Sequence, residues 1–154
     1  KTEVLTSVLT GEAREIAHFF AALGRDVCTW RDSCDLPICI IAGGETTVTL
    51  KGEGLGGRCQ EMALSFLNNL RKPPLIADRI FFLSAGTDGN DGPTDAAGAF
   101  ASMELFRKGR ELGLDPEKFI AASDSYHYHE KTGGLLKTGP TGTNVCDIQV
   151  LLVV

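Results

Sequence analysis

The sequence of 154 residues lacks several features that would each point to a particular class of protein. It has no excess of basic residues: 20 Asp and Glu outnumber 15 Lys and Arg, and the net charge is −5. This balance argues against a nucleic-acid partner. The apolar runs are far shorter than a membrane span. No internal repeat and no low-complexity linker divides the chain, so we expect a single domain.

The cysteine pattern disfavours two further classes. The five cysteines are an odd number, and no Cys-x-x-Cys pair occurs. A disulfide framework and a zinc site are therefore both disfavoured. We expect reduced, mostly buried thiols in a cytoplasmic protein. The chain begins with Lys1 rather than a methionine, and we expect it to be a piece of a longer protein.

Glycine, in contrast, is concentrated in three regions of the chain. Residues 43–57, 86–95 and 133–144 hold 13 of the 18 glycines. Binding residues gather on loops that a rigid scaffold holds in place. Three separate loops with unusual backbone demands therefore predict one composite site.

Helical and β-rich segments alternate along the rest of the chain, which predicts an α/β fold. We expect three α/β/α layers around a mixed, mostly parallel sheet that includes one antiparallel hairpin. The hairpin would join Ile38–Ala42 to Thr46–Leu50. The other segments are helices over Glu12–Leu23, Arg58–Leu70 and Ser102–Leu112, a helix start at Asp115, and strands over Arg79–Ser84 and Cys146–Val154.

The first glycine-rich region leads directly into a predicted helix. Gly56 and Gly57 allow a ligand to approach the backbone closely, and the free N–H groups of a helix start favour an anion. Arg58 opens this helix, where the helix dipole disfavours a cation. An arginine in such a place needs a partner, and a phosphate or a carboxylate is the natural candidate.

The same region contains a partial dinucleotide-binding fingerprint. Gly52, Gly54 and Gly57 fit the Gly-x-Gly-x-x-Gly spacing. The acidic residue expected about 20 positions further on is Asp78, but it precedes the second strand instead of ending it. We therefore favour another kind of phosphate or carboxylate loop. A purely structural glycine turn remains an alternative.

The second region carries four polar side chains on one tight loop: Asp88, Asn90, Asp91 and Asp95. Turn formation and helix capping are their simplest roles. The spacing does not fit a calcium-binding EF-hand loop. A Mg²⁺ site that uses Asp88 and Asp91 together with substrate phosphates needs fewer ligands, and a general base is a further possibility.

The third region combines a cation with hydroxyl groups. It lacks the Gly-Lys-Ser/Thr order of a Walker A loop. Lys137 could be a solvated surface lysine or an anion ligand. The candidate phosphate ligands here are Lys137, Thr138, Thr141, Thr143 and Asn144. Further upstream, His127 and His129 stand two apart, which splits them across a helix, so packing is favoured over metal binding.

Four of these blocks together resemble a known family. They are residues 43–47 (Gly-Gly-Glu-Thr-Thr), 56–61 (Gly-Gly-Arg-Cys-Gln-Glu), 86–94 (Gly-Thr-Asp-Gly-Asn-Asp-Gly-Pro-Thr) and 138–145 (Thr-Gly-Pro-Thr-Gly-Thr-Asn-Val). In this order they are similar to the C-terminal, or MOFRL, domain of the glycerate 2-kinase family. The similarity runs from about Leu5 to Val154.

The resemblance implies an ATP-dependent kinase that phosphorylates D-glycerate at its 2-hydroxyl group. It also implies a larger N-terminal α/β domain, absent here, with the active site between the two domains. Arg58 matches the family arginine thought to be catalytic. Asp88 or Asp91 would hold Mg²⁺ or orient the hydroxyl group. The remaining ligands would come from Gly43, Gly44, Glu45, Gly56, Gly57, Lys137 and Thr138–Asn144.

Two departures and two alternatives accompany this resemblance. Cys59 stands where the family usually has Asn, and His129 replaces a usual aromatic residue. Family members have also been labelled hydroxypyruvate reductases, so an NAD(P)-dependent reductase is one alternative and the glycine spacing is its support. A non-catalytic metabolite-binding or interaction module is the other.

Overall fold

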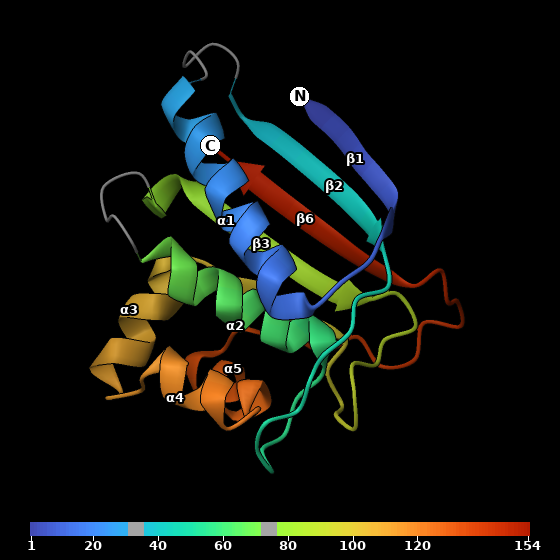
Figure 1. Cartoon of the computed structure of the whole chain (residues 1–154), viewed down its shortest axis with the longest axis vertical. Helices are drawn as coiled ribbons and strands as arrows, with labels where there is room; N and C mark the ends of the chain where they lie inside the picture. The colour runs from blue at the N-terminus through green and yellow to red at the C-terminus, as the bar shows by residue number, and fades with distance from the viewer. Residues whose placement is uncertain (31–35, 72–76) are drawn as a thin grey trace.

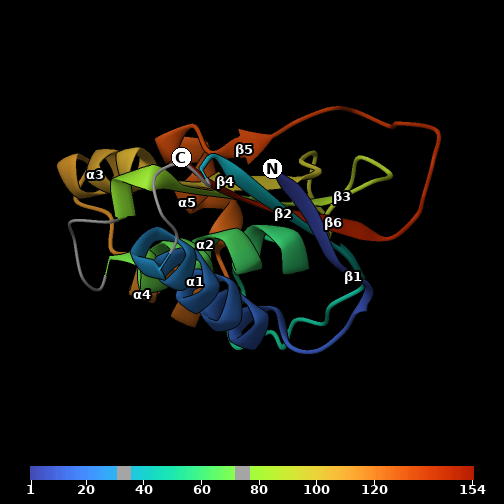
Figure 2. The same cartoon turned by 90° about the horizontal axis from the view of Figure 1, so that it is seen from above.

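The structure is a computed structural model that describes residues 1–30, 36–71 and 77–154. Six strands form one sheet in the order β1-β2-β6-β3-β4-β5; Figure 1 labels the first four of these strands, and Figure 2 also labels β4 and β5. The strands are β1 (Thr2–Leu9), β2 (Ile38–Gly44), β3 (Ile80–Gly86), β4 (Gly98–Ala101), β5 (Leu135–Leu136) and β6 (Asp147–Val153). Strands and helices share one domain, which confirms the predicted α/β class.

The prediction of a mostly parallel sheet is wrong. Only β1 and β2 run parallel, and the pairs β2–β6, β6–β3, β3–β4 and β4–β5 are antiparallel. The last strand, β6, enters between β2 and β3 in the opposite direction. Buried and half-buried residues alternate along β2 and β6, a pattern typical of antiparallel sheets with one covered face.

The predicted hairpin is also absent. Residues 46–50 form no strand; they are attached to the start of the first helix. Ala13 donates its N–H to the carbonyl oxygen of Thr47 at 2.8 Å, and Thr49 donates its N–H to the carboxylate of Glu12 at 2.8 Å. The reason is the sheet order, because β1 and β6 already occupy both edges of β2.

Two long helices cover one face of the sheet. They are α1 (Ala13–Trp30) and α2 (Arg58–Leu70), and Figure 2 shows both below the sheet. The short helices α3 (Met103–Glu111), α4 (Pro116–Ala121) and α5 (Ser125–Thr132) pack around α2. No helix among the described residues covers the opposite face of β2, β6 and β3, where Phe81 remains exposed. The predicted third layer is therefore missing from this part of the chain.

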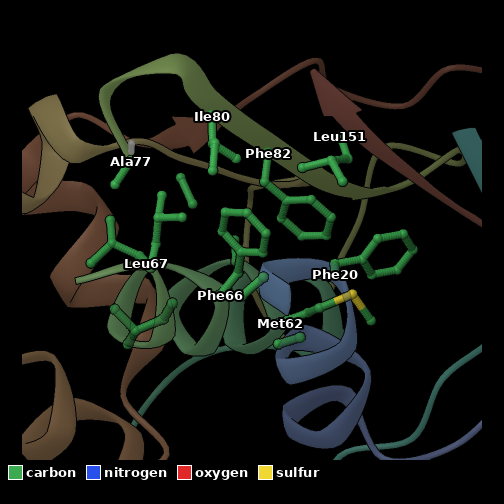
Figure 3. Packing of buried hydrophobic residues seen from close by; sticks show 14 of the residues in the cluster. Phe20, Met62, Phe66, Leu67, Ala77, Ile80, Phe82 and Leu151 are labelled. Atoms are coloured by element: carbon green, nitrogen blue, oxygen red, sulfur yellow. The ribbon is translucent and has the colours of Figure 1, made fainter. Parts of the chain in front are cut away.

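The core lies between these helices and the sheet. The Phe82 ring of β3 lies 4.4 Å from the Phe66 ring of α2 and 5.2 Å from the Phe20 ring of α1 (Figure 3). Each of these side chains contributes roughly 1.5–3 kcal/mol through burial. None of the described helices is both long and apolar enough to cross a bilayer.

The sheet register brings the glycine-rich regions together. Gly44 at the end of β2 and Gly86 at the end of β3 both pair with Asp147, the first residue of β6. The segments that leave β2 and β3 and the segment that enters β6 therefore meet at one end of the sheet. The three loops thus converge at one end of the sheet, and a composite site formed by all three stays a prediction.

Candidate functional site

A groove of about 480 Å³ lies at this end of the sheet, and Arg58 is part of its wall. Arg58 is the first residue of α2 and follows Gly57 in extended conformation. Four of the predicted site residues line the groove: Glu45, Gly56, Gly57 and Arg58. Gly92 and Pro93 of the second glycine-rich region also line it, and the other lining residues are Thr46, Thr47, Val48 and Leu50. The structure thus joins the first two regions around the arginine.

Arg58 has an internal partner that the sequence analysis did not identify. Its Nε donates to Oδ2 of Asp147 at 2.6 Å, and its Nη2 donates to Oδ1 at 2.8 Å. These hydrogen bonds raise the pKa of the Arg58 guanidinium, against the opposing effect of burial. The Asp147 side chain is fully buried, whereas that of Arg58 is 32 % exposed. Arg58 is therefore held on its buried side and open on the other.

Glu45 stands near the open side of the same guanidinium. Its Oε1 lies 3.5 Å from Nη2 of Arg58, and its side chain is largely exposed. The Nε edge of the guanidinium is occupied by Asp147, which leaves the Nη1–Nη2 edge with its donors available. Such an edge can take a carboxylate or a phosphate through two parallel hydrogen bonds.

Asp91 caps the helix that carries Arg58. Its Oδ1 accepts the N–H of Cys59 at 3.0 Å, and its Oδ2 accepts the N–H of Gln60 at 2.8 Å. Gly57 permits this approach, because a Cβ atom there would lie 2.3 Å from Oδ1 of Asp91. The anion that the sequence predicts at this helix start is thus a side chain of the protein itself. Burial raises the pKa of Asp91 to about 6, although its hydrogen bonds act in the opposite direction.

The carboxylate oxygens of Asp88 and Asp91 are not arranged as the predicted magnesium site requires. Both oxygens of Asp91 are committed to backbone N–H groups. Asp88 accepts from the N–H of Asn90 through Oδ1 and lies 3.4 Å from the amide of Asn144 through Oδ2. Among the described residues, no group of three or more His, Cys, Asp or Glu is arranged to hold a metal ion. We therefore assign no metal to Asp88 and Asp91.

The third glycine-rich region is bonded to the second rather than to the groove. Thr87 donates its hydroxyl to the carbonyl oxygen of Cys146 at 2.7 Å, and Thr141 donates its hydroxyl to the carbonyl oxygen of Thr87. Gly89 has a φ of +92°, and a Cβ there would collide with the Gly139 carbonyl oxygen. The Asp88–Asn144 contact belongs to the same junction. Thr138, Thr141, Thr143 and Asn144 are exposed on it.

Lys137 already has partners in this structure. Its Nζ donates to the carboxylate of Asp95 at 2.9 Å and to the hydroxyl of Tyr126 at 3.0 Å. The lysine is therefore neither a free surface cation nor part of the lining of the Arg58 groove.

The partial dinucleotide fingerprint has a structural explanation. The loop from Lys51 to Leu55 is bonded to the turn between α4 and α5, with the Gly54 N–H donating to the Ala122 carbonyl oxygen at 3.0 Å. No strand leads directly into it, since β2 ends at Gly44 and residues 46–50 are irregular, and the fingerprint requires one.

The two histidines lie in different surroundings, one partly exposed and one buried. His127 lies 2.6 Å from the carboxylate of Asp124. His129 is fully buried, and its Nε2 lies 3.1 Å from the Gln60 carbonyl oxygen. Burial lowers the pKa of His129 to about 4.

Gly43 and Gly44 lie at the end of β2, opposite Ile148 and Asp147. Gly43 lines a second, smaller hollow of about 220 Å³, to which Asp147 also contributes. Asp147 itself gave one signal in the sequence: it is a charged residue at the start of a strand that is apolar apart from Gln149. Such a residue is rarely buried unless it is paired.

Fold and site together define an α/β domain whose glycine-rich loops gather around an arginine at a helix start. Residues 38–147 match the family model described as the MOFRL family. The match covers well over half of the chain, and the chain belongs to this family.

Named relatives extend the match to nearly the whole chain. A D-glycerate 2-kinase of Thermotoga maritima is 42% identical over 99% of this chain and 36% of its own length. A glycerate 2-kinase of Pyrococcus horikoshii is 38% identical over 99% of the chain and 34% of its own length. The human glycerate kinase is 48% identical over 76% of the chain and 23% of its own length.

Solved structures give the same result. A glycerate kinase crystal structure from Thermotoga maritima superposes on the whole chain with a TM-score of 0.92 and 42% identity. It is covered over 36% of its length. A Pyrococcus horikoshii structure gives a TM-score of 0.89 with 34% coverage. The chain thus spans about a third of the length of the first relatives that it matches.

Proposed function

We propose that this chain is the C-terminal domain of an ATP-dependent D-glycerate 2-kinase of the cytoplasm. The observation that carries the proposal is that only one edge of the Arg58 guanidinium is bonded to Asp147. It is bonded on one edge to Asp147 and faces a groove between two glycine-rich loops with the other. The relatives named glycerate 2-kinase match this chain from end to end, which supports the same proposal.

The proposed chemistry follows from the free edge of Arg58. Phosphoryl transfer depends mainly on positioning and on neutralising charge. In the proposal, the two free donors of Arg58 hold the transferred phosphoryl group or the glycerate carboxylate. Gly56 and Gly57 line the same groove, and their missing side chains make room for Ser125 and Asp91. In the proposal, the larger N-terminal domain that the family resemblance implies supplies the opposite wall.

The remaining predicted ligands take a secondary place in the proposal. Asp88, Lys137 and Thr138–Asn144 lie beside the junction of the second and third regions, where they could contact the outer part of the nucleotide. Mg²⁺ enters the proposal only as the ion that accompanies ATP, because the Asp91 oxygens are already bonded.

The test is an activity assay on the full-length protein. With ATP, Mg²⁺ and D-glycerate we expect phosphoglycerate to form, whereas NADH with hydroxypyruvate should show no oxidation of the nicotinamide. We expect the chain alone to unfold in one cooperative thermal transition and to show no turnover, because it forms only one wall of the site. Hydroxypyruvate-dependent NADH oxidation without kinase activity would replace the proposal with the reductase.

A further inference from the structure

We infer that Asp147 is a positioning residue for the phosphoryl-transfer step: it binds the Nε edge of Arg58 and thereby directs the Nη1–Nη2 edge into the groove. The inference rests on the proposed function. It assigns a role to a residue that neither the glycine-rich motifs nor the helix start would identify.

The first support is the rigidity of Asp147 itself. It is the first residue of β6, and its backbone pairs with Gly44 on one side and Gly86 on the other. Its carboxylate is fully buried and accepts two hydrogen bonds from the same guanidinium. Three strands therefore fix the position of this carboxylate, and the carboxylate fixes the plane of the guanidinium.

The second support is that the backbone of Arg58 is fixed independently. Asp91 caps the helix start through the N–H groups of Cys59 and Gln60, the two residues that follow Arg58. The main chain is thus held from the second glycine-rich region and the side chain from β6. A reacting arginine needs both, because a misplacement of about 1 Å can cost about 10²-fold in rate.

The third support is the edge that Asp147 leaves free. A guanidinium has five N–H donors, and Asp147 takes one from Nε and one from Nη2. The remaining donors belong to the side that lines the groove together with Glu45. Because Asp147 binds the Nε–Nη2 side of the guanidinium, a ligand of Arg58 is expected to bind the Nη1–Nη2 edge.

The experiment compares Asp147→Asn with Asp78→Asn in the full-length enzyme. Asp78 forms a similar two-oxygen pair with Arg107, but both of these side chains are about half exposed, away from the groove. We expect Asp147→Asn to lower kcat by roughly 10²-fold, and Asp78→Asn to leave kcat unchanged. Normal kcat in a folded Asp147→Asn enzyme overturns the inference.

Chemical rescue separates positioning from a loss of fold. In Arg58→Ala, added guanidinium ion should occupy the vacant space against Asp147 and restore part of the activity. In the double variant Arg58→Ala/Asp147→Asn, the same guanidinium concentration should restore nothing. Equal rescue in both variants contradicts a positioning role. Failure of the proposed function is a different result, because the unmodified enzyme would then not phosphorylate glycerate at all.

Discussion

Two arginines in this domain form the same side-on pair with a carboxylate, in different surroundings. Arg14 of α1 binds both oxygens of Glu61 on α2, and its Nη2 also donates to the Ile120 carbonyl oxygen at 3.0 Å. Its side chain is 14 % exposed and that of Glu61 is 3 % exposed. Arg58 binds both oxygens of Asp147 but has no third hydrogen bond to the main chain.

The difference lies in what the remaining edge of the guanidinium does. Arg14 uses one donor of this edge to join α1 and α2 to α4 through the Ile120 carbonyl oxygen. Arg58 lines a groove together with Glu45, which stands beside its remaining edge. A buried carboxylate partner is therefore no sign of function by itself; the free edge distinguishes a binding arginine from a structural one.

The largest expected effect comes from breaking the structural pair. Arg14→Ala leaves Glu61 buried without its cation, and removal of one partner of a buried pair costs about 3–5 kcal/mol. We expect the free energy of unfolding to fall by this amount in urea titrations of the chain. Arg107→Ala, at an exposed pair, is the matched control and should cost less than about 1 kcal/mol. Similar losses in the two variants would remove the distinction between the buried and exposed pairs.

The second prediction concerns Asp91, which caps the helix that begins with Arg58. Its folded pKa of about 6 exceeds the ordinary value of 3.8 because of burial, so the folded state binds this proton more tightly than the unfolded state does. The resulting stability is fully present below about pH 4 and is lost as the pH rises through about 6. The difference of roughly two pKa units corresponds to about 3 kcal/mol.

Asp91→Asn should remove this pH dependence. The amide oxygen still accepts one helix-start N–H, so the fold persists while the titrating group is gone. The measurement is the free energy of unfolding of both proteins between pH 4 and pH 7. A difference between the two that stays constant over this range would show that Asp91 does not titrate there.

The third prediction concerns Arg58, for which we propose a role in substrate binding, in the full-length enzyme. Arg58→Ala should lower kcat/KM by roughly 10²-fold or more, the usual effect of one lost electrostatic donor. Arg58→Lys should recover little, because an ammonium cannot bind through two planar donors. Cys59→Ser is the neighbouring control and should change turnover much less, with thermal melts to confirm folding. A well-folded Arg58→Ala enzyme with near-normal kcat/KM would place Arg58 beside Arg14 as a structural residue.

The sequence predicted the elements that are long and periodic. Helix α2 begins and ends where its apolar spacing and the glycine and proline signals indicated, at Arg58 and Leu70. Strand β1 was missed because it is an edge strand with exposed residues on both faces. Strand β4 was missed because it is only four residues long and rich in small residues. The sheet directions depended on where β6 inserts, which no local pattern encodes.

The sequence predicted which kind of group would lie at the start of α2 and beside Arg58, but not which residues would supply it. The glycine-rich helix start correctly indicated an anion at the helix N-terminus and a partner for Arg58. Both turned out to be carboxylates of the protein, Asp91 and Asp147, at sequence separations of 31 to 89 residues. Only the tertiary structure brings such distant residues together, so local spacing could indicate the need for them but not their identity.

The smallest expected effect concerns Glu45, the carboxylate near the free edge of Arg58. It lies 3.5 Å from Nη2 without a hydrogen bond, and it is largely exposed. An anionic substrate that binds this edge must displace Glu45, so Glu45→Gln should lower the KM for the anion that Arg58 binds and leave kcat nearly unchanged. An exposed pair contributes about 0.2–1 kcal/mol, which corresponds to a change of roughly 1.5- to 5-fold.

The measurement is KM for D-glycerate and for ATP, each at low and at high salt. The variant's advantage should shrink at high salt, because screening weakens the competition between Glu45 and the substrate. The substrate whose KM changes also identifies the anion that Arg58 binds. If KM instead rises for both substrates, Glu45 supports binding rather than competing with it. Asp147 and Glu45 would then both orient Arg58 for its ligand, whereas the carboxylate partner of Arg14 holds two helices together.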